Sequence, residues 1–180
     1  MFVPVAKQGD SFAKKRVLDY NYERKAVDMK NFVDHNMPSF IEKVSGDLSK
    51  FQEKAQRNGL PQVLLFTSKA KTLALTKYLS TEFRRRLLIA EIHPTKPNKV
   101  IMDDFGIKDL PALLVIPHAA EGKQEAVRYL GDGFTRNKLH SFLSEHALKK
   151  KVFPSKKKME DDSGASSTGE SAGGSARTDL

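Results

Sequence analysis

Two apolar segments separated by a single helix constrain the fold of this chain more strongly than any other sequence feature. Residues 63–66 and 87–92 read VLLF and LLIAEI, a pattern typical of strands covered on both faces of a sheet. Between them, apolar side chains recur at helical spacing from Leu73 to Phe83, with Thr72 as the expected N-cap. Because a helical crossover of about a dozen residues favours parallel pairing, these segments predict a βαβ unit in an α/β domain.

The segments that follow predict the remainder of the sheet. A short helix is expected over 97–106, and an apolar strand over 112–117 starts directly after Pro111, a position at which a strand tolerates proline. A further strand near 127–130 and a closing helix over 135–148 complete the pattern. The predicted order of this part is therefore β α β α β β α.

An internal repeat, in which apolar residues match at one constant offset, indicates how the rest of the chain is organised. The matched apolar pairs are Val17 and Val127, Met29 and Leu139, Phe32 and Phe142, and Val33 and Leu143. The repeat predicts that residues 1–44 are the last hairpin and last helix of an earlier copy, whose first half is missing from this chain. Residues 45–59 are then expected to form a connecting helix, and residues 60–148 the complete copy.

The composition excludes thiol chemistry. The chain has no cysteine, so it can have no disulfide, thiolate zinc site, iron–sulfur cluster or CxxC redox pair. With 39% hydrophobic and 29% charged residues, the composition is that of a globular domain with a polar appendage. No apolar run approaches the roughly 18 residues of a membrane span, and the first residues are too few for the apolar region of a signal peptide.

The net charge of +9 is concentrated near the C-terminus, where residues 149–158 contain six lysines. Such a cluster binds nucleic acid, an anionic membrane or an import receptor, or else it is a solvated boundary that keeps the chain soluble. The solvated boundary is the simpler interpretation, and nucleic acid is the less expected partner, because only Phe153 is available for base stacking. The Ser- and Gly-rich residues that complete the 149–180 tail are expected to be disordered.

Residues 105–115 carry the sharpest family signal. Their sequence, FGIKDLPALLV, is similar to the thioredoxin stretch in which a short turn precedes a strand that begins with a cis-proline. Together with the element order, it resembles the thioredoxin fold, an α/β fold with a central mixed sheet and helices on both faces. The resemblance implies a cis peptide bond between Leu110 and Pro111.

The tandem arrangement narrows this resemblance to the non-catalytic thioredoxin-like domain of protein disulfide isomerase-type proteins. Residues 22–24 with the following helix are similar to the element that closes the catalytic domains of that family, and residues 63–67 and 79–83 look like its non-catalytic domains. The family's CxxC belongs in the loop over 67–72, which holds no cysteine. Because disulfide exchange needs an attacking thiolate and a resolving thiol, this chain by itself is expected to be redox-inactive.

The candidate peptide-binding residues lie beside the expected cis-proline, where an extended peptide can add main-chain hydrogen bonds. They are Ser68, Lys69, Ala70, Lys71, Leu110 and Pro111. The alternative is that the last two only form the start of a strand and that the lysines of the loop are solvated. No catalytic residue or cofactor is expected. No metal site is expected either, because the five histidines show no metal-ligand spacing.

The resemblance implies a redox-inactive module that binds unfolded or partly folded client proteins and so assists oxidative folding. Its partner would be a catalytic thioredoxin domain missing from this chain, and its location the lumen of the endoplasmic reticulum. The last residues, 177–180 (RTDL), are only a distant match to the retention signal Lys-Asp-Glu-Leu. Two alternatives remain open: a basic protein that binds nucleic acid or acidic membrane through residues 149–158, and a scaffold that only spaces other domains.

Overall fold

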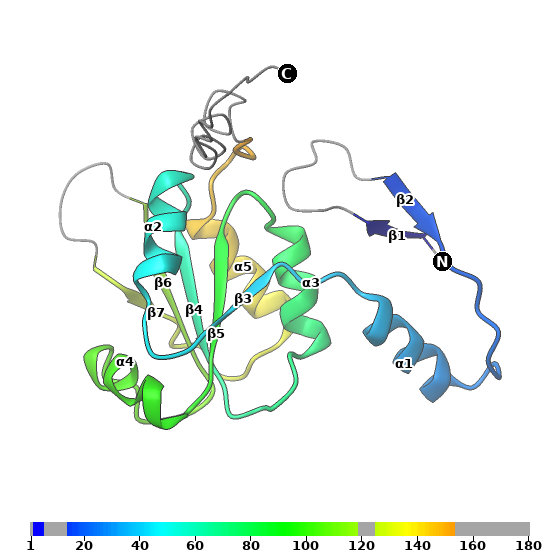
Figure 1. Ribbon diagram of the computed structural model, residues 1–180, viewed down its shortest axis with the longest axis horizontal. Helices are drawn as coiled ribbons and strands as arrows, with labels where there is room; N and C mark the ends of the chain where they lie inside the picture. The colour runs from blue at the N-terminus through cyan, green and yellow to red at the C-terminus, as the bar shows by residue number, and fades with distance from the viewer. Residues whose placement is uncertain (1, 6–13, 119–124, 154–180) are drawn as a thin grey trace, which may run out of the picture.

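The two apolar segments of the predicted βαβ unit form neighbouring parallel strands at the centre of a five-stranded sheet (Figure 1). The computed structural model describes residues 2–5, 14–118 and 125–153. The sheet has the strand order β3-β5-β4-β6-β7, in which the first three strands are parallel and each of the last two is antiparallel to the strand before it. The strands are β3 (Ile41–Val44), β4 (Gln62–Phe66), β5 (Leu88–Ile92), β6 (Ala112–Ile116) and β7 (Val127–Arg128).

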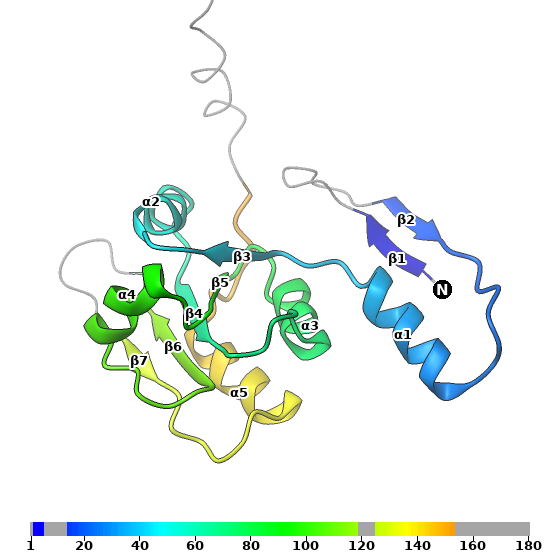
Figure 2. The same ribbon diagram turned by 60° about the horizontal axis from the view of Figure 1, so that its bottom comes forward.

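Helices cover both faces of this sheet, as Figure 2 shows. On one face lie α2 and α4, and on the other α3 and α5, which together enclose two apolar cores. The helices are α2 (Ser49–Arg57), α3 (Ala74–Glu82), α4 (Lys99–Asp104), which follows a short 3-10 turn η1 (Lys96–Asn98), and α5 (Arg136–His146).

The uninterrupted apolar runs are explained by the alternation of side chains along each strand. In β4, Leu64 and Phe66 enter the core under α2 and α4, whereas Val63 and Leu65 enter the core under α3 and α5. A central strand that is covered on both faces needs apolar side chains at every position. The mixed sheet, its strand order and its helices on both faces make this a thioredoxin-like fold, and the predicted order β α β α β β α is confirmed from β4 to α5.

The domain begins earlier in the chain than the sequence indicates. Residues 41–44, predicted to belong to the preceding copy, form the edge strand β3 and pair in parallel with β5. Residues 45–59, predicted to be only a connecting helix, contain α2, whose Phe51 and Ala55 are buried in the core against the sheet. Both elements are therefore parts of the domain, because β3 pairs with an edge of β5 and α2 covers one face of the sheet.

Asn98 fastens the edge strand to the rest of the domain. Its buried side chain accepts a hydrogen bond from the Gly46 N–H at 2.6 Å, and its Nδ2 donates to the carbonyl oxygens of His93 at 2.8 Å and Val44 at 3.3 Å. One side chain thus joins the ends of β3 and β5. This contact holds the residues after β3 in place before α2 begins.

An N-terminal unit precedes the domain and is defined here as β1 (Phe2–Val5), β2 (Lys14–Val17) and α1 (Ala26–Asn36). Its two strands pair antiparallel. The first and last residue numbers of α1 and α5 differ by the same offset as the matched apolar pairs. When this offset is added to the residue numbers of β1, they fall within β6. The N-terminal unit therefore has the same order of elements as the end of the domain, a hairpin followed by a helix.

Side-chain contacts repeat at the same offset. The Tyr20 hydroxyl donates to the Glu23 carbonyl oxygen and its ring packs edge-on against Phe32. In the domain, the Tyr129 hydroxyl donates to the Gly133 carbonyl oxygen at 3.1 Å and its ring packs edge-on against Phe142. The acceptors and the phenylalanines correspond at this offset, while the tyrosines depart from it by a single position. These contacts support the repeat that the sequence indicates.

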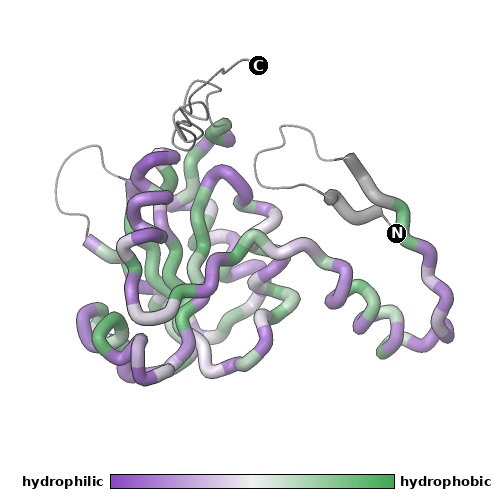
Figure 3. Tube along the Cα trace, in the orientation of Figure 1, coloured by the Kyte–Doolittle hydropathy of each residue, from purple (hydrophilic) through white to green (hydrophobic). Residues whose placement is uncertain are grey.

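The two equivalent helices differ in what covers them. Met29 of α1 is 49% exposed, whereas Leu139, its counterpart in α5, is only 3% exposed. Figure 3 shows hydrophobic stretches along β4 and β5 inside the domain and further hydrophobic residues along α1 outside it. The N-terminal unit meets the domain at α3, where Lys77 Nζ donates to the Asp34 carbonyl oxygen at 2.7 Å. Within the described residues, α1 contributes no buried side chain.

None of the helices within residues 2–5, 14–118 and 125–153 combines the length and the apolar character that crossing a membrane requires.

Candidate functional site

The pairing of β4 with β6 brings the candidate loop to the candidate proline. In this antiparallel register Phe66 is opposite Ala112, so the residues after β4 lie beside those that precede β6. The Leu110–Pro111 peptide bond is cis, as the resemblance implies. The loop over 67–73 and Pro111 therefore share one edge of the sheet.

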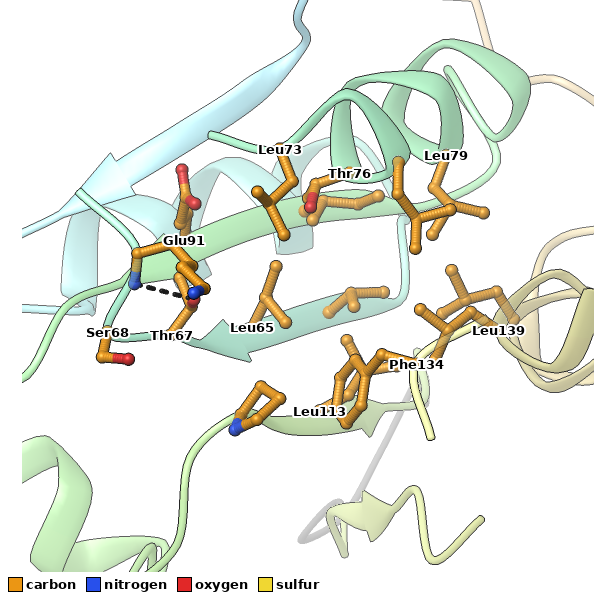
Figure 4. Close-up of a pocket in the computed structure, with 16 residues that line it drawn as sticks. Leu65, Thr67, Ser68, Leu73, Thr76, Leu79, Glu91, Leu113, Phe134 and Leu139 are labelled. Carbon is orange, nitrogen blue, oxygen red and sulfur yellow. Dashed lines mark hydrogen bonds between the residues drawn. The ribbon is translucent and has the colours of Figure 1, made fainter. Parts of the chain in front are cut away.

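An apolar cavity of about 130 Å³ lies at this edge, between the sheet, α3 and α5 (Figure 4). Its interior is formed by buried side chains of the core under α3 and α5, among them Leu65, Leu79 and Leu139. Exposed residues line it as well, and Leu73, which directly precedes α3, is 48% exposed. The cavity is therefore an apolar space that reaches the protein surface beside Leu73.

Few polar groups line this cavity. Thr67 and Thr76 are buried, and Thr67 Oγ1 accepts a hydrogen bond from the Lys69 N–H at 3.2 Å. Glu91 of β5 also lines it and is only 1% exposed. The Thr72 hydroxyl donates a hydrogen bond to the Glu91 carboxylate. A mostly apolar cavity with a few placed polar groups is the usual form of a ligand-binding site.

The structure separates the six candidate residues into two groups. Ser68, Lys69 and Pro111 line the cavity. Ala70 and Lys71 are exposed in the loop and do not line it. Leu110 is partly buried against the opposite core, beneath α2 and α4, so it faces away from the cavity.

The expected role of Thr72 as a helix N-cap is wrong. The helix α3 begins at Ala74, with Leu73 at the N-cap position and no side-chain capping hydrogen bond. The Thr72 hydroxyl bonds instead to Glu91, on the neighbouring strand β5. This contact leaves Leu73 at the mouth of the cavity.

Sequence reasoning missed Glu91, Leu73 and Phe134 as lining residues. For Glu91 a signal existed, because it is the one charged residue within the apolar segment 87–92. A charge in a strand that is covered on both faces is costly to bury, and such groups gather at functional sites. Phe134 is far from the loop in sequence and reaches the cavity only because β7 and α5 fold back onto the sheet.

Among the described residues, this site has neither a thiol nor a group of metal-ligating side chains. The chain has no cysteine, so the loop after β4 offers no thiol for disulfide exchange. Among residues 2–5, 14–118 and 125–153, no three His, Asp or Glu side chains are grouped so that they could hold a metal ion. His140 illustrates how the histidines are used, since its ring packs against Phe83 and lies 3.4 Å from the Ser144 hydroxyl.

Comparison with known proteins gives no match to a family model. Among curated proteins, the chain is 27% identical over 127 residues to the DnaJ protein ERDJ3A of Oryza sativa subsp. japonica. It is 32% identical over 142 residues to a "Putative protein disulfide-isomerase" of Dictyostelium discoideum. These alignments cover 71% and 78% of this chain but only 21% and 31% of the two relatives, so the chain spans less than a third of either.

Solved structures similar to the chain include a thioredoxin and a thioredoxin-containing fragment. Thioredoxin NaTrxh from Nicotiana alata aligns at 15% identity with a TM-score of 0.46, covering 62% of this chain and 96% of that one. The J-Trx1 fragment of ERdj5 aligns at 18% identity with a TM-score of 0.45, covering 70% of this chain and 61% of that one. Its own strand order and cis-proline make the unit from β3 to α5 a thioredoxin-like domain, and the curated relatives support the likeness of this chain to protein disulfide isomerase-like proteins.

Proposed function

We propose that this domain is a redox-inactive module that binds unfolded or partly folded client proteins at the cavity beside Pro111. The observation that carries the proposal is an apolar cavity that reaches the surface beside the loop after β4, in a chain without a thiol. A catalytic thioredoxin domain is the proposed partner in disulfide chemistry. The names of the curated relatives, a DnaJ protein and a protein disulfide-isomerase, support a role in protein folding. The resemblance supports the lumen of the endoplasmic reticulum as its location.

The size of the cavity suits one client side chain. An apolar cavity of about 150 Å³ is large enough to bind benzene, so the present volume of about 130 Å³ accommodates a group of similar size. Leu73 and Pro111 at the mouth supply apolar contact for the residues on either side of that group. A binding site for one side chain on an extended segment accepts an unfolded chain more readily than a folded surface.

The test is an aggregation assay with a reduced client, run beside an insulin-reduction assay. We expect the chain to slow aggregation and to show no thiol-dependent turnover. Replacing Leu73 with aspartate should weaken client protection about tenfold, because a charge at the apolar mouth removes burial worth roughly 1.5–3 kcal/mol. The matched control is Val100→Asp in α4, which places the same charge at an exposed valine on the opposite face of the sheet.

Equal protection by both variants would contradict client binding at the cavity. No slowing of aggregation by the unaltered chain would favour the alternative of a spacer or scaffold domain. Thiol-dependent insulin reduction by this chain would overturn the proposal altogether.

A second candidate function is binding of an anionic surface, and two tertiary hydrogen bonds favour it. The Val152 N–H donates to the Arg85 carbonyl oxygen at 3.0 Å, and Arg86 Nε donates to the Leu148 carbonyl oxygen at 2.7 Å. These bonds bring two basic segments together and form what we term the basic face. Its residues are Arg84, Arg85, Arg86, Lys149, Lys150 and Lys151. The remaining lysines of the predicted cluster, at 156–158, lie outside the described residues.

Binding to vesicles that contain an anionic lipid, and to duplex DNA, tests the basic face. We expect affinity to fall steeply with salt and to drop further when Lys149, Lys150 and Lys151 are replaced by alanine, because each lost phosphate contact flattens the salt slope by about 0.9 for duplex DNA. The control replaces the exposed Lys96, Lys99 and Lys108 by alanine, which removes the same charge elsewhere. Equal losses in both triple variants would show a net-charge effect and no role for this face.

A further inference from the structure

The buried carboxylate of Glu91 has no cationic partner in the described part of the chain. The ion pairs found there join Lys25 to Glu23, Lys54 to Glu42 and Lys138 to Asp132, and none of them involves Glu91. Burying an ionised carboxylate without a partner is expensive, and removing a charge from water is offset only by close opposite charge and hydrogen bonds. Glu91 is therefore a buried acidic group whose charge a bound cation would offset.

The Glu91 carboxylate also retains capacity for hydrogen bonds. A carboxylate accepts about four, and the Thr72 hydroxyl supplies one of them. Two lysines lie in its neighbourhood: Lys43 is its register partner on β3, and Lys69 lines the same cavity. Both are exposed, and neither forms an ion pair with Glu91. The carboxylate thus has one described hydrogen bond from a neutral hydroxyl and no charged partner.

The cavity places this charge beside apolar space. Figure 4 shows Glu91 at the end of the cavity near Thr67 and Ser68, with Leu139 at the other end. The interior is apolar, so a client side chain that fills it leaves the neighbouring client residue near the Glu91 end. A ligand that matches both features has a large apolar side chain next to a cationic group.

We infer that the cavity selects client segments in which a basic residue adjoins a large apolar residue, with Glu91 as the counter-charge. The inference rests on the proposed client binding and states its specificity. The charge of the chain as a whole works in the opposite direction, because a net charge of +9 repels cationic peptides and attracts acidic ones. A preference for a basic peptide would therefore arise from Glu91 and not from the net charge of the chain.

The test uses the full chain and three peptides of one length that differ only in the residue before a central leucine, which is Lys, Gln or Glu. We expect the Lys peptide to bind most tightly and the Glu peptide most weakly, with about a tenfold step between Lys and Gln, the usual range for a hydrogen-bonded charge. Glu91→Gln should remove the step between the Lys and Gln peptides, because it removes the counter-charge for the peptide lysine. Thermal unfolding of the variant checks that it folds.

Lys69→Ala provides a second variant, which tests the inference without altering the buried Glu91. Removing this exposed lysine from the cavity should raise the affinity for the Lys peptide several-fold, because a competing cation is lost. Equal binding of all three peptides, or a Lys preference that survives Glu91→Gln, would overturn the inference and leave client binding intact. If no peptide binds and Leu73→Asp leaves client protection unchanged, the proposed function fails together with it.

Discussion

Replacing Leu139 with alanine should lower the free energy of unfolding by about 2–5 kcal/mol, whereas Met29→Ala should change it by less than about 0.5 kcal/mol. The two residues occupy equivalent positions in the repeat, but Leu139 is 3% exposed and Met29 is 49% exposed. A buried leucine loses both its transfer free energy and its packing when it is truncated, since a cavity remains. An exposed methionine loses little of either.

This comparison reports whether the N-terminal unit behaves as a helix and hairpin without a core. Urea unfolding followed by far-ultraviolet circular dichroism measures it, because the chain has no tryptophan to follow by fluorescence. A cost for Met29→Ala close to that of Leu139→Ala would show that another surface covers α1 in solution. The description of α1 as a helix exposed to solvent would then be wrong.

Asn98→Ala should lower the free energy of unfolding by about 2–4 kcal/mol, because it removes hydrogen bonds to partly or fully buried backbone groups. Gly46 N–H and the carbonyl oxygens of Val44 and His93 lose their described side-chain partner. Each buried polar group left without a partner costs about 1–3 kcal/mol. The exposed Asn137→Ala in α5 is the matched control and should cost less than about 0.5 kcal/mol.

Amide hydrogen exchange localises the effect. In Asn98→Ala, the Gly46 amide and the amides of β3 should exchange faster, while those of β4 and β6 follow only the global loss of stability. Unchanged exchange in β3 would show that Asn98 does not hold the edge strand. The attachment of β3 to the domain would then rest on its pairing with β5 alone.

The central sheet could be predicted because the burial of its strands on both faces is visible in their own sequences. Residues 63–66 and 112–116 are apolar at every position, and buried strands of this kind need no distant information to be identified. The turn before Pro111 and the internal repeat are likewise visible in the sequence itself. The structure confirms the cis peptide bond that the resemblance implied and places β4 beside β5 in parallel.

The edge of the domain could not be predicted in this way. The strand β3 reads IEKV, and only Val44 in it is buried, so its sequence resembles that of a polar connection. In α2 the buried positions are Phe51 and Ala55. Such elements belong to the domain because they pair with β5 and cover the sheet, and those contacts join residues far apart in the chain.

The cavity also depends on contacts between distant elements. The sequence points to Ser68 and Lys69 through their loop and to Pro111 through the expected cis-proline, and the register of β4 with β6 brings these residues together. The register does not reveal that Leu110 faces the other core, or that Glu91 approaches from β5. The direction of a side chain follows from the face of the strand that carries it, which sequence alone leaves ambiguous at a turn.

By itself, the sequence determined that this chain has no thiol chemistry, since the absence of cysteine needs no coordinates, and that its centre is a buried α/β sheet. Only the tertiary structure decided where the domain begins, that a cavity opens beside Pro111, and that a buried carboxylate lies in its wall. The physical reason is the range of the interactions. Composition and apolar periodicity are properties of single segments, whereas a cavity and an unpaired charge exist only where several segments pack together.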